Sequence, residues 1–370
     1  MRSWGASMEE YERMLSLRSG PLPEVLHVCP LKPSLDIGEP FTYDSSSKMD
    51  NRSSFGKALA DVGVRNKGVC GRTPILAFDC DLMGSVKLDG FAKACPEGFI
   101  QAGIQEHNTA TVAGAASVAG VVSVWADFGV FGLDEVYNQQ RLNDINGSSL
   151  KLFLTHVGLD VGEDGKTHQC VDYVGLFANT FGWKVVVPAD PNQTDRAVRW
   201  ALSQEGNVCV AMGRSVLPVL TYPDGNPIFA GDYSFRYGAV DVVRDGVHGT
   251  ILALGPMVGR ALKGAEILAD RGIQVRVLCT ASPLGMSADE LFDLVGKGPL
   301  LTVEDHNVNT GLGAVVANLM ARSGVSIPFM PIGVSRYGDS GASDDVYRRM
   351  GLDPEGIAKS FLRLKERNDA

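Results

Sequence analysis

The chain has 370 residues, of which 45% are hydrophobic and 21% are charged, as in soluble globular proteins and unlike disordered or membrane chains. At roughly 100 to 200 residues per domain, this length predicts two or three domains. The formal charge of −9, from 43 acidic and 34 basic residues, opposes broad contact with a phosphate backbone and argues against nucleic acid as a partner.

The cysteines and the first residues indicate the compartment. The seven cysteines are odd in number, widely scattered and free of any CxxC pair, so we expect reduced thiols and a cytoplasmic location. The first 20 residues carry acidic side chains early, and no segment approaches 18 uninterrupted apolar residues. We therefore expect neither a signal peptide nor contact with a membrane.

The first 222 residues divide into an extension and a predicted domain. A short helix is predicted over residues 8–18, but the rest of residues 1–50 is rich in Pro and Ser and is assigned to an N-terminal extension. From residue 51, helical segments alternate with the strand-like runs "TPILAFDCD", "VVSVWADFG", "LKLFLTHVG", "WKVVVPADP" and "VCVAMGR". This alternation is typical of βαβ units with a parallel sheet, and it predicts an α/β domain over residues 51–222.

A second α/β series follows a stretch that is rich in turn residues. The segment "TYPDGNPIFAGDYS" predicts a linker over residues 223–235. After it, the strand-like runs "GTILALG", "IQVRVLCT" and "PLLTVED" alternate with helices predicted over residues 257–270, 287–296 and 311–322. The predicted fold class is therefore α/β, with two tandem parallel-sheet domains, the second over residues 236–370.

One acidic residue stands at the start of a predicted small-residue helix, in "GIQEHN". Glu106 in that first turn would stabilise the helix by roughly 0.3 to 1 kcal/mol, which is a sufficient structural explanation if the motif is taken alone. Other motifs are less informative, because "GLGAVVA" has Val316 where a dinucleotide fingerprint needs a third glycine. The six histidines form no HxxxH pair, so no metal site is predicted on this chain.

Several motifs in order resemble the C-terminal half of transketolase, a thiamine-diphosphate enzyme that moves two-carbon ketol units between sugar phosphates. "GIQEHN" is similar to its cofactor-activating Glu motif, "LTHVGLDVGEDGKTHQ" to its substrate loop and "GRSVLP" to its arginine strand. "YGDSGASDDVYRRMGLDPEGIAKS" is similar to the C-terminal end of that family. The resemblance covers about residues 50 to 365 and implies a pyrimidine-binding domain followed by a transketolase C-terminal domain.

The resemblance implies which residues bind the cofactor. Glu106 matches the family Glu that hydrogen-bonds a pyrimidine nitrogen and thereby promotes removal of the thiazolium proton. Phe128 and Phe131 of "ADFGVFG" match the aromatic cradle of the pyrimidine, and Asp81 of "FDCDLMGS" matches an acid close to the cofactor. Taken from the residues alone, the two Phe side chains fit an ordinary core equally well, and Asp81 fits a helix cap.

The resemblance also implies how the sugar phosphate is bound. Charge-assisted or polar hydrogen bonds to the phosphate are assigned to Arg52, Ser85, His156 and Arg214. Asp164 matches the residue on the side of the donor's 2-position hydroxyl, and His168 matches the one near the reacting carbonyl. Catalytic roles are therefore expected for Glu106, His156 and His168, since a histidine with an accessible pKa can shuttle protons.

Two departures from the family pattern bear on substrates and partners. Val157 follows His156 where the family usually has Asp, and Asp134 replaces a frequent aromatic, which leaves the donor and acceptor sugars open. The chain also contains no GDG motif, with which the family anchors the diphosphate through Mg²⁺. The resemblance thus implies a separate N-terminal, diphosphate-binding subunit that carries the Mg²⁺ ligands, and an α2β2 assembly.

Three alternatives remain open from the sequence. Deoxyxylulose-phosphate synthase-like enzymes and the β subunits of oxo-acid dehydrogenases also use a Glu-activated thiamine. The intact "GEDGKTHQ" loop together with Arg214 favours transketolase over the dehydrogenase. A non-catalytic paralogue that acts as a scaffold would have no need for Glu106, His156, Asp164 and His168 together.

Overall fold

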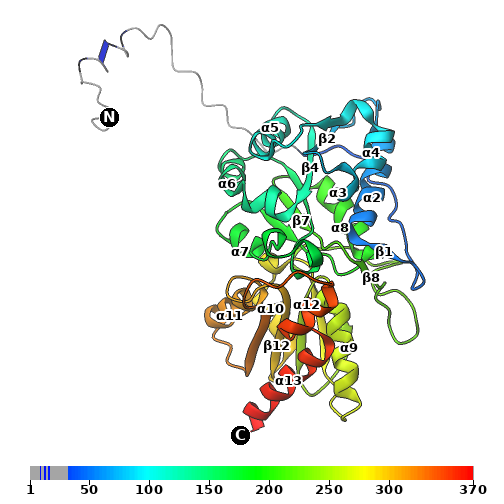
Figure 1. Ribbon diagram of the computed structural model, residues 1–370, viewed down its shortest axis with the longest axis vertical. Coiled ribbons are helices and arrows are strands. Elements are labelled where there is room, and N and C mark those ends of the chain that lie inside the picture. The colour runs from blue at the N-terminus through cyan, green and yellow to red at the C-terminus, as the bar shows by residue number, and fades with distance from the viewer. Residues whose placement is uncertain (1–8, 10–11, 14–15, 17–31, 370) are drawn as a thin grey trace.

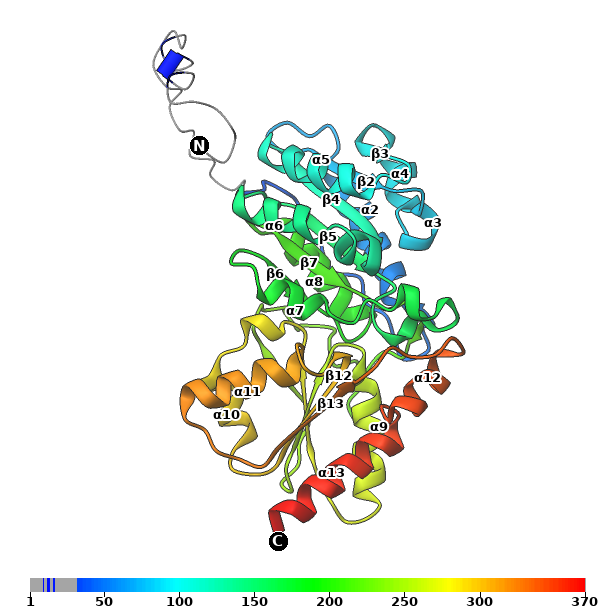
Figure 2. The same cartoon turned by 60° about the vertical axis from the view of Figure 1, so that its left-hand side comes forward.

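The chain forms two α/β domains that follow one another along its long axis, as Figures 1 and 2 show for this computed structural model. The structure describes residues 9, 12, 13, 16 and 32–369. The helix predicted over residues 8–18 lies largely outside these residues. The prediction of two tandem α/β domains is confirmed.

The first domain is built on a six-stranded sheet in which all paired strands are parallel. Its strands, in spatial order, are β3 (Phe99–Gln101), β2 (Ile75–Asp79), β4 (Val122–Phe128), β5 (Lys151–Thr155), β7 (Val208–Ala211) and β6 (Lys184–Val186). The central strands are buried along nearly their whole length, as expected for apolar runs covered by helices on both faces. The five strand-like runs predicted before residue 222 are each confirmed as one of these strands.

Helices cover both faces of this sheet (Figure 1). They are α2 (Asn51–Asn66), α3 (Met83–Val86), α4 (Asp89–Ala94), α5 (Glu106–Val118), α6 (Tyr137–Ile145), α7 (Tyr173–Ala178) and α8 (Pro191–Ser203). Helix α5 is rich in small residues because it packs closely on α6. A Cβ built on Gly114 would lie 1.9 Å from Asn143 Oδ1, and Asn143 Nδ2 donates to Ala110 O at 3.1 Å.

Residues 32–50, which the sequence analysis assigned to an extension, pack on the first domain. Tyr43 N–H donates to Asn192 Oδ1 at 2.8 Å, and Asn192 Nδ2 donates back to Tyr43 O at 2.9 Å. Strand β1 (Met49–Asp50) then pairs antiparallel with β8 (Val216–Leu217), beside the start of α2. This part of the chain therefore fixes α2 and α8 relative to the arginine strand.

The second domain is built on a five-stranded sheet with one antiparallel edge strand. Its strands, in spatial order, are β13 (Phe329–Val334), β12 (Leu300–Asn307), β10 (Thr250–Leu254), β11 (Arg276–Thr280) and the antiparallel β9 (Val240–Arg244). Its helices are α9 (Met257–Ala269), α10 (Ala288–Val295), α11 (Leu312–Ser323), α12 (Ser343–Met350) and α13 (Pro354–Asp369). Three of these helices confirm those predicted over residues 257–270, 287–296 and 311–322.

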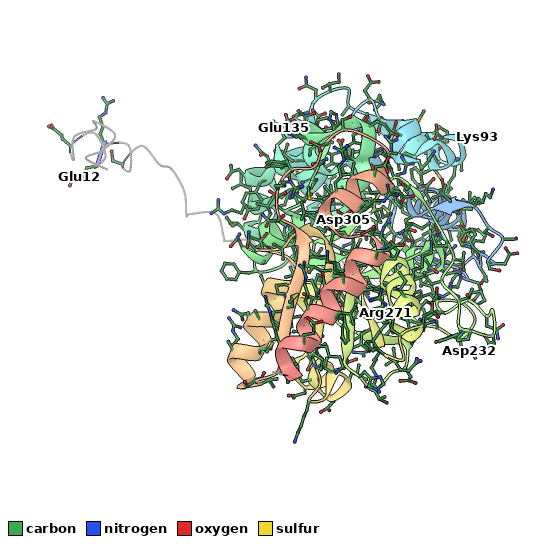
Figure 3. All side chains as sticks on the ribbon, turned by 60° about the horizontal axis from the view of Figure 1, so that its bottom comes forward. Glu12, Lys93, Glu135, Asp232, Arg271 and Asp305 are labelled. Atoms are coloured by element: carbon green, nitrogen blue, oxygen red, sulfur yellow. The ribbon has the colours of Figure 1, made fainter. Side chains whose placement is uncertain are left out.

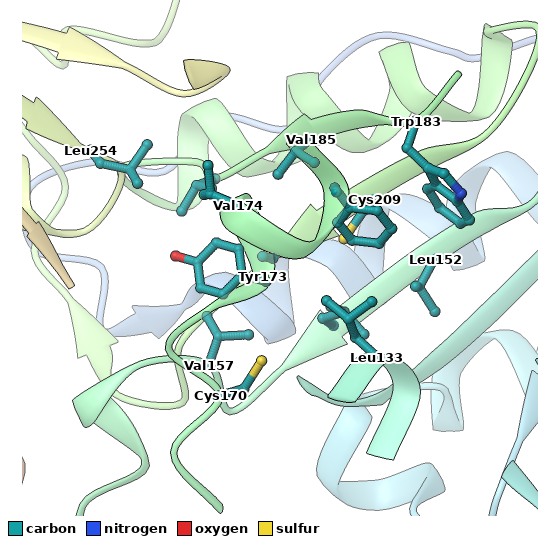
Figure 4. Packing of buried hydrophobic residues seen from close by; sticks show 14 of the residues in the cluster. Leu133, Leu152, Val157, Cys170, Tyr173, Val174, Trp183, Val185, Cys209 and Leu254 are labelled. Carbon is teal, nitrogen blue, oxygen red and sulfur yellow. The ribbon is translucent and has the colours of Figure 1, made fainter. Parts of the chain in front are cut away.

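Hydrophobic clusters extend across both domains. Figure 4 shows Leu254 of the second sheet approaching Val174 of α7, within a single cluster of buried residues. His306 crosses the same boundary, because its Nε2 accepts the Val174 N–H at 3.0 Å while its Nδ1 lies 3.0 Å from Asn307 O. Burial lowers the pKa of His306 to about 4, so this ring is neutral at physiological pH and can accept that bond.

The second domain also holds the loop that follows β5. Asp305, labelled in Figure 3, accepts the Leu159 N–H at 2.9 Å and the Tyr347 hydroxyl at 2.5 Å. Further along the loop, Gln169 Oε1 accepts the Gly338 N–H at 2.7 Å, and Ser343 Oγ donates to Asp160 O at 3.0 Å. The second domain therefore helps to fix the position of residues 156–172.

The sequence predicted that the chain does not span a membrane and that its cysteines are reduced. Across the helices of the described residues, none combines the length and the apolar character needed to cross a membrane. The described cysteines are free thiols: Cys70, Cys80, Cys95, Cys170, Cys209 and Cys279.

Candidate active site

Most of the predicted site residues gather at the carboxyl ends of neighbouring parallel strands, where ligands of open α/β sheets bind. Asp81 follows β2, Phe128 ends β4 and His156 follows β5. Glu106 begins α5, directly after the loop that leaves β3. The sheet order β3-β2-β4-β5 places these four chain segments next to one another.

Glu106 lies at this edge, with 9% of the residue exposed. It makes no hydrogen bond or ion pair with any other residue that the structure describes. One of its oxygens, Cys80 Sγ and an Asp127 carboxylate oxygen all lie within 4.8 Å of one another. Glu106 therefore has a free acceptor in a largely enclosed place.

Two phenyl rings lie at the same edge of the sheet. Phe128 and Phe131 have ring centroids 5.8 Å apart and planes 12° from parallel, and both are half-buried. The ring centroids of Phe128 and His156 are 3.7 Å apart. Those of Phe131 and His168 are 5.6 Å apart, in a T-shaped arrangement. The aromatic pair thus contacts both predicted catalytic histidines.

His156 is held as a neutral ring with a defined tautomer. Its Nε2 lies 3.2 Å from Arg52 Nη1 and its Nδ1 lies 2.9 Å from Thr155 Oγ1. Because a guanidinium only donates, Nε2 is the acceptor and the proton sits on Nδ1, which donates to Thr155. Burial, reinforced by Arg52 and Arg214, lowers the pKa of His156 to about 3.

Arg52 joins helix α2 to the rim of the site. Its Nη1 donates to Ser85 O at 3.0 Å, and its Nη2 donates to Arg214 O at 2.8 Å. Arg214 in turn pairs with Glu163 at 2.6 Å and with Asp164 at 3.2 Å. The predicted phosphate-binding residues are therefore connected through Arg52, but Ser85 contacts it through the carbonyl oxygen and not through the hydroxyl.

Asp81 lies at the same edge of the sheet and lines a pocket together with Ser85. It is exposed, its backbone has a positive φ of 65°, and its N–H donates to Gln101 Oε1 at 2.9 Å. Among the described contacts, none links its carboxylate to the other predicted site residues. A left-handed non-glycine residue at a strand end is a strained conformation that often accompanies a functional site.

Asp127 was not among the site residues predicted from the sequence. This residue is fully buried at the end of β4, next to Phe128, and its Oδ1 accepts the Phe128 N–H at 2.8 Å. The signal was available, because an acid inside the otherwise apolar run "VVSVWADFG" needs an explanation. Asp134, noted as a departure, lies with Cys170 and Asp172, and burial together with Asp172 raises its pKa to about 8.

Comparison with known protein families divides the chain in the same way. Residues 47–219 match the transketolase pyrimidine binding domain, and residues 238–357 match the transketolase C-terminal domain. A putative transketolase C-terminal section of Methanocaldococcus jannaschii is 30% identical over 84% of this chain and 95% of its own length. One subunit of the apulose-4-phosphate transketolase from Actinobacillus succinogenes is 26% identical over 79% of this chain and 91% of its own length.

Solved structures agree with these matches. A structure described as a split gene transketolase, inactive beta4 tetramer, superposes with a TM-score of 0.75 at 30% identity, covering 86% of this chain and 99% of that chain. Transketolase from Pichia stipitis, at 20% identity and a TM-score of 0.73, shares the fold over 88% of this chain and 47% of its own. The chain likewise spans about half of rat transketolase, at 52% of that protein's length. This chain belongs to the transketolase family, in which it comprises the pyrimidine-binding and C-terminal domains.

Proposed function

We propose that this chain is the cofactor-activating subunit of a split transketolase that transfers a two-carbon ketol unit between sugar phosphates. The observation that carries the proposal is Glu106, a residue only 9% exposed whose carboxylate has no partner among the described residues, at the same sheet edge as the stacked Phe128 and Phe131 rings. Arg52, His156 and Arg214 lie connected at the same edge of the sheet. A regulatory scaffold would not need this combination.

The side chains at this edge fit the pyrimidine half of thiamine diphosphate. When bound, this cofactor supplies a nucleophilic thiazolium carbon that also serves as an electron sink. Phe128 and Phe131 offer an apolar stacking surface for a flat ring, worth roughly 0.5 to 1.5 kcal/mol beyond the buried area. Glu106 would hold the hydrogen bond to a ring nitrogen, because its carboxylate has a free acceptor there.

The remaining residues suit an anionic, hydroxylated substrate. Arg214 is 31% exposed and paired with exposed carboxylates, so a phosphate can take their place. Neutral His156 accepts a hydrogen bond from Arg52 at its Nε2, which connects it to the phosphate-binding residues proposed here. His168, half-buried at the edge of Phe131, is placed to hold or move a proton near the reacting carbonyl.

A second polypeptide would complete the site. The sequence has no GDG motif, and the chain covers about half of the rat enzyme. The Actinobacillus succinogenes relative is named as one subunit of its enzyme, and the described β4 tetramer is named as inactive. These observations support an N-terminal, diphosphate-binding partner that holds Mg²⁺, an α2β2 assembly and, from the free thiols, a cytoplasmic setting.

Calorimetry with and without the partner tests this proposal. We expect tight binding of thiamine diphosphate with Mg²⁺, and turnover of a ketose phosphate, only when this chain is mixed with a diphosphate-binding subunit. Tight binding by the isolated chain would contradict the split site. Pyruvate decarboxylation by the mixture without ketose turnover would instead identify an oxo-acid dehydrogenase-type enzyme.

Replacing Arg214 by Met should weaken substrate binding in the same mixture. Loss of one charge-assisted hydrogen-bonding group, at about 1.5 to 3 kcal/mol, predicts a KM for the sugar phosphate that is roughly 10- to 100-fold higher. Steady-state kinetics would measure it, with Arg236→Met as the control, because Arg236 pairs with Glu290 on an exposed surface. An unchanged KM would remove Arg214 from the phosphate site.

A further inference from the structure

A second carboxyl group lies behind Glu106, fully enclosed by protein. Asp127 has no exposed surface, and its Oδ1 accepts the Phe128 N–H at 2.8 Å. Its Oδ2 is also buried and has no hydrogen-bond partner among the described residues. A buried carboxylate oxygen without a partner is unfavourable when it is ionised, whereas a protonated oxygen can donate to a neighbour.

The titratable groups with the largest effects on the pKa of Asp127 are acidic. They come from two neighbouring segments: Glu106 from α5, and Asp79 with Cys80 from the end of β2. Cys80 Sγ lies 3.3 Å from Thr109 Oγ1, and burial raises the pKa of its thiol to about 12. Asp79 is already occupied, because it accepts from Leu82 N–H and from Gln101 Nε2. Glu106 is therefore the one unoccupied anionic acceptor among these neighbours.

We propose that Asp127 is a positioning residue that keeps a proton on Oδ2 and directs it toward the Glu106 carboxylate. One oxygen of Glu106 would then be oriented by Asp127, which leaves the other for the ring nitrogen of the cofactor. The pair would carry a single negative charge in place of two. The role assigned to Glu106 rests on the proposed function, but the proton on Asp127 does not.

The electrostatics of the site support this state. Burial, followed by the charges of Glu106 and Asp79, raises the pKa of Asp127 to about 8. Below that pH the carboxyl is neutral and can donate. Above it, two carboxylates with oxygens within 4.8 Å would repel one another in a water-poor site. The affinity for thiamine diphosphate should then fall, approaching tenfold per pH unit, because binding becomes linked to one proton.

Carbon-13 NMR of aspartate carboxyl groups in the isolated chain tests the proton directly. We expect two aspartate resonances that titrate near pH 8 in the natural chain, from Asp127 and Asp134, of which one is missing from Asp127→Asn. Asp134→Asn is the matched control, because its pKa is also raised to about 8, and the Asp127 signal should persist in that variant. Asp127→Ser, which also lacks a titrating group, provides an independent assignment. An Asp127 signal that titrates near pH 4 would overturn the proposal.

Calorimetry of the assembled complex between pH 7 and 9.5 tests the positioning role. Asp127→Asn keeps an acceptor for the Phe128 N–H and a neutral donor at the second position, so the cofactor affinity should stay flat where that of the natural chain falls. If Asp127 is merely structural, the cofactor affinity of Asp127→Asn should still fall with rising pH, and this result would overturn the proposal. If the complex never binds the cofactor at any pH, the proposed function fails, whereas the NMR titration still decides the protonation of Asp127.

Discussion

Turnover of the assembled enzyme should fall by roughly 10²- to 10⁴-fold when Glu106 is replaced by Gln, the range that general acid–base groups contribute. Gln has nearly the same shape, but it cannot take up or share a proton with a ring nitrogen. The start of α5 should survive the change, because the Glu106 side chain makes no hydrogen bond or ion pair with the described residues. The expected defect is therefore in chemistry and not in folding.

Steady-state kinetics and hydrogen–deuterium exchange at the cofactor's thiazolium carbon would measure this effect in the reconstituted complex. Glu135→Gln is the matched control, because Glu135 is an exposed acid of the same domain, labelled in Figure 3, whose Oε1 lies 3.8 Å from His107 Nε2. It should leave both rates within about twofold, as most exposed substitutions are nearly neutral. Unchanged turnover in Glu106→Gln would remove the catalytic assignment.

Replacing Arg199 by Met should destabilise the fold by about 3 to 5 kcal/mol, the usual effect of breaking a buried ion pair. The Arg199 side chain is 2% exposed and donates to Asp195 Oδ1 and to Asp61 Oδ2, each at 2.7 Å. It also donates to Ile37 O, which holds the first described segment against α8. Its loss leaves the buried Asp195 without its ion-pair partner.

Urea unfolding of the isolated chain would measure this loss as a lower midpoint. Arg65→Met is a suitable control, because Arg65 pairs with the same Asp61 at 3.0 Å but is 40% exposed, so it should cost no more than about 1 kcal/mol. A variant that replaces Asp195 by Leu as well should recover part of the stability, because no charge is then stranded. Equal effects of the two arginine changes would contradict this account.

Local patterns predicted the strands because the central strands of a parallel sheet are continuous apolar runs. The two strands that were missed in the second domain lie at the edges of its sheet. Strand β13 contains Pro331 and Gly333, which obscure a strand pattern yet are tolerated at an edge. Strand β9 follows the turn-rich linker and contains polar Asp241 and Arg244. Edge position, which decides whether these residues are acceptable, is a property of the assembled sheet.

The site residues came from motifs, but their chemical states did not. The neutral state of His156 depends on Arg52, which lies 104 positions away in the sequence, and on burial that no motif reports. The packing of residues 32–50 depends on contacts such as that of Tyr43 with Asn192, 149 positions apart. Asp127 differs from these cases, because its own strand sequence already showed an acid in an apolar run and could have identified it.

The contacts between the domains have a consequence for protein engineering. Every predicted site residue precedes the linker. The loop over residues 156–172 is nevertheless hydrogen-bonded by Asp305, Gly338 and Ser343 of the second domain. A chimera that carried a relative's C-terminal domain would keep the complete set of site residues while exchanging the supports of that loop. Domain exchange would therefore alter the position of His168 without a single substitution within the loop.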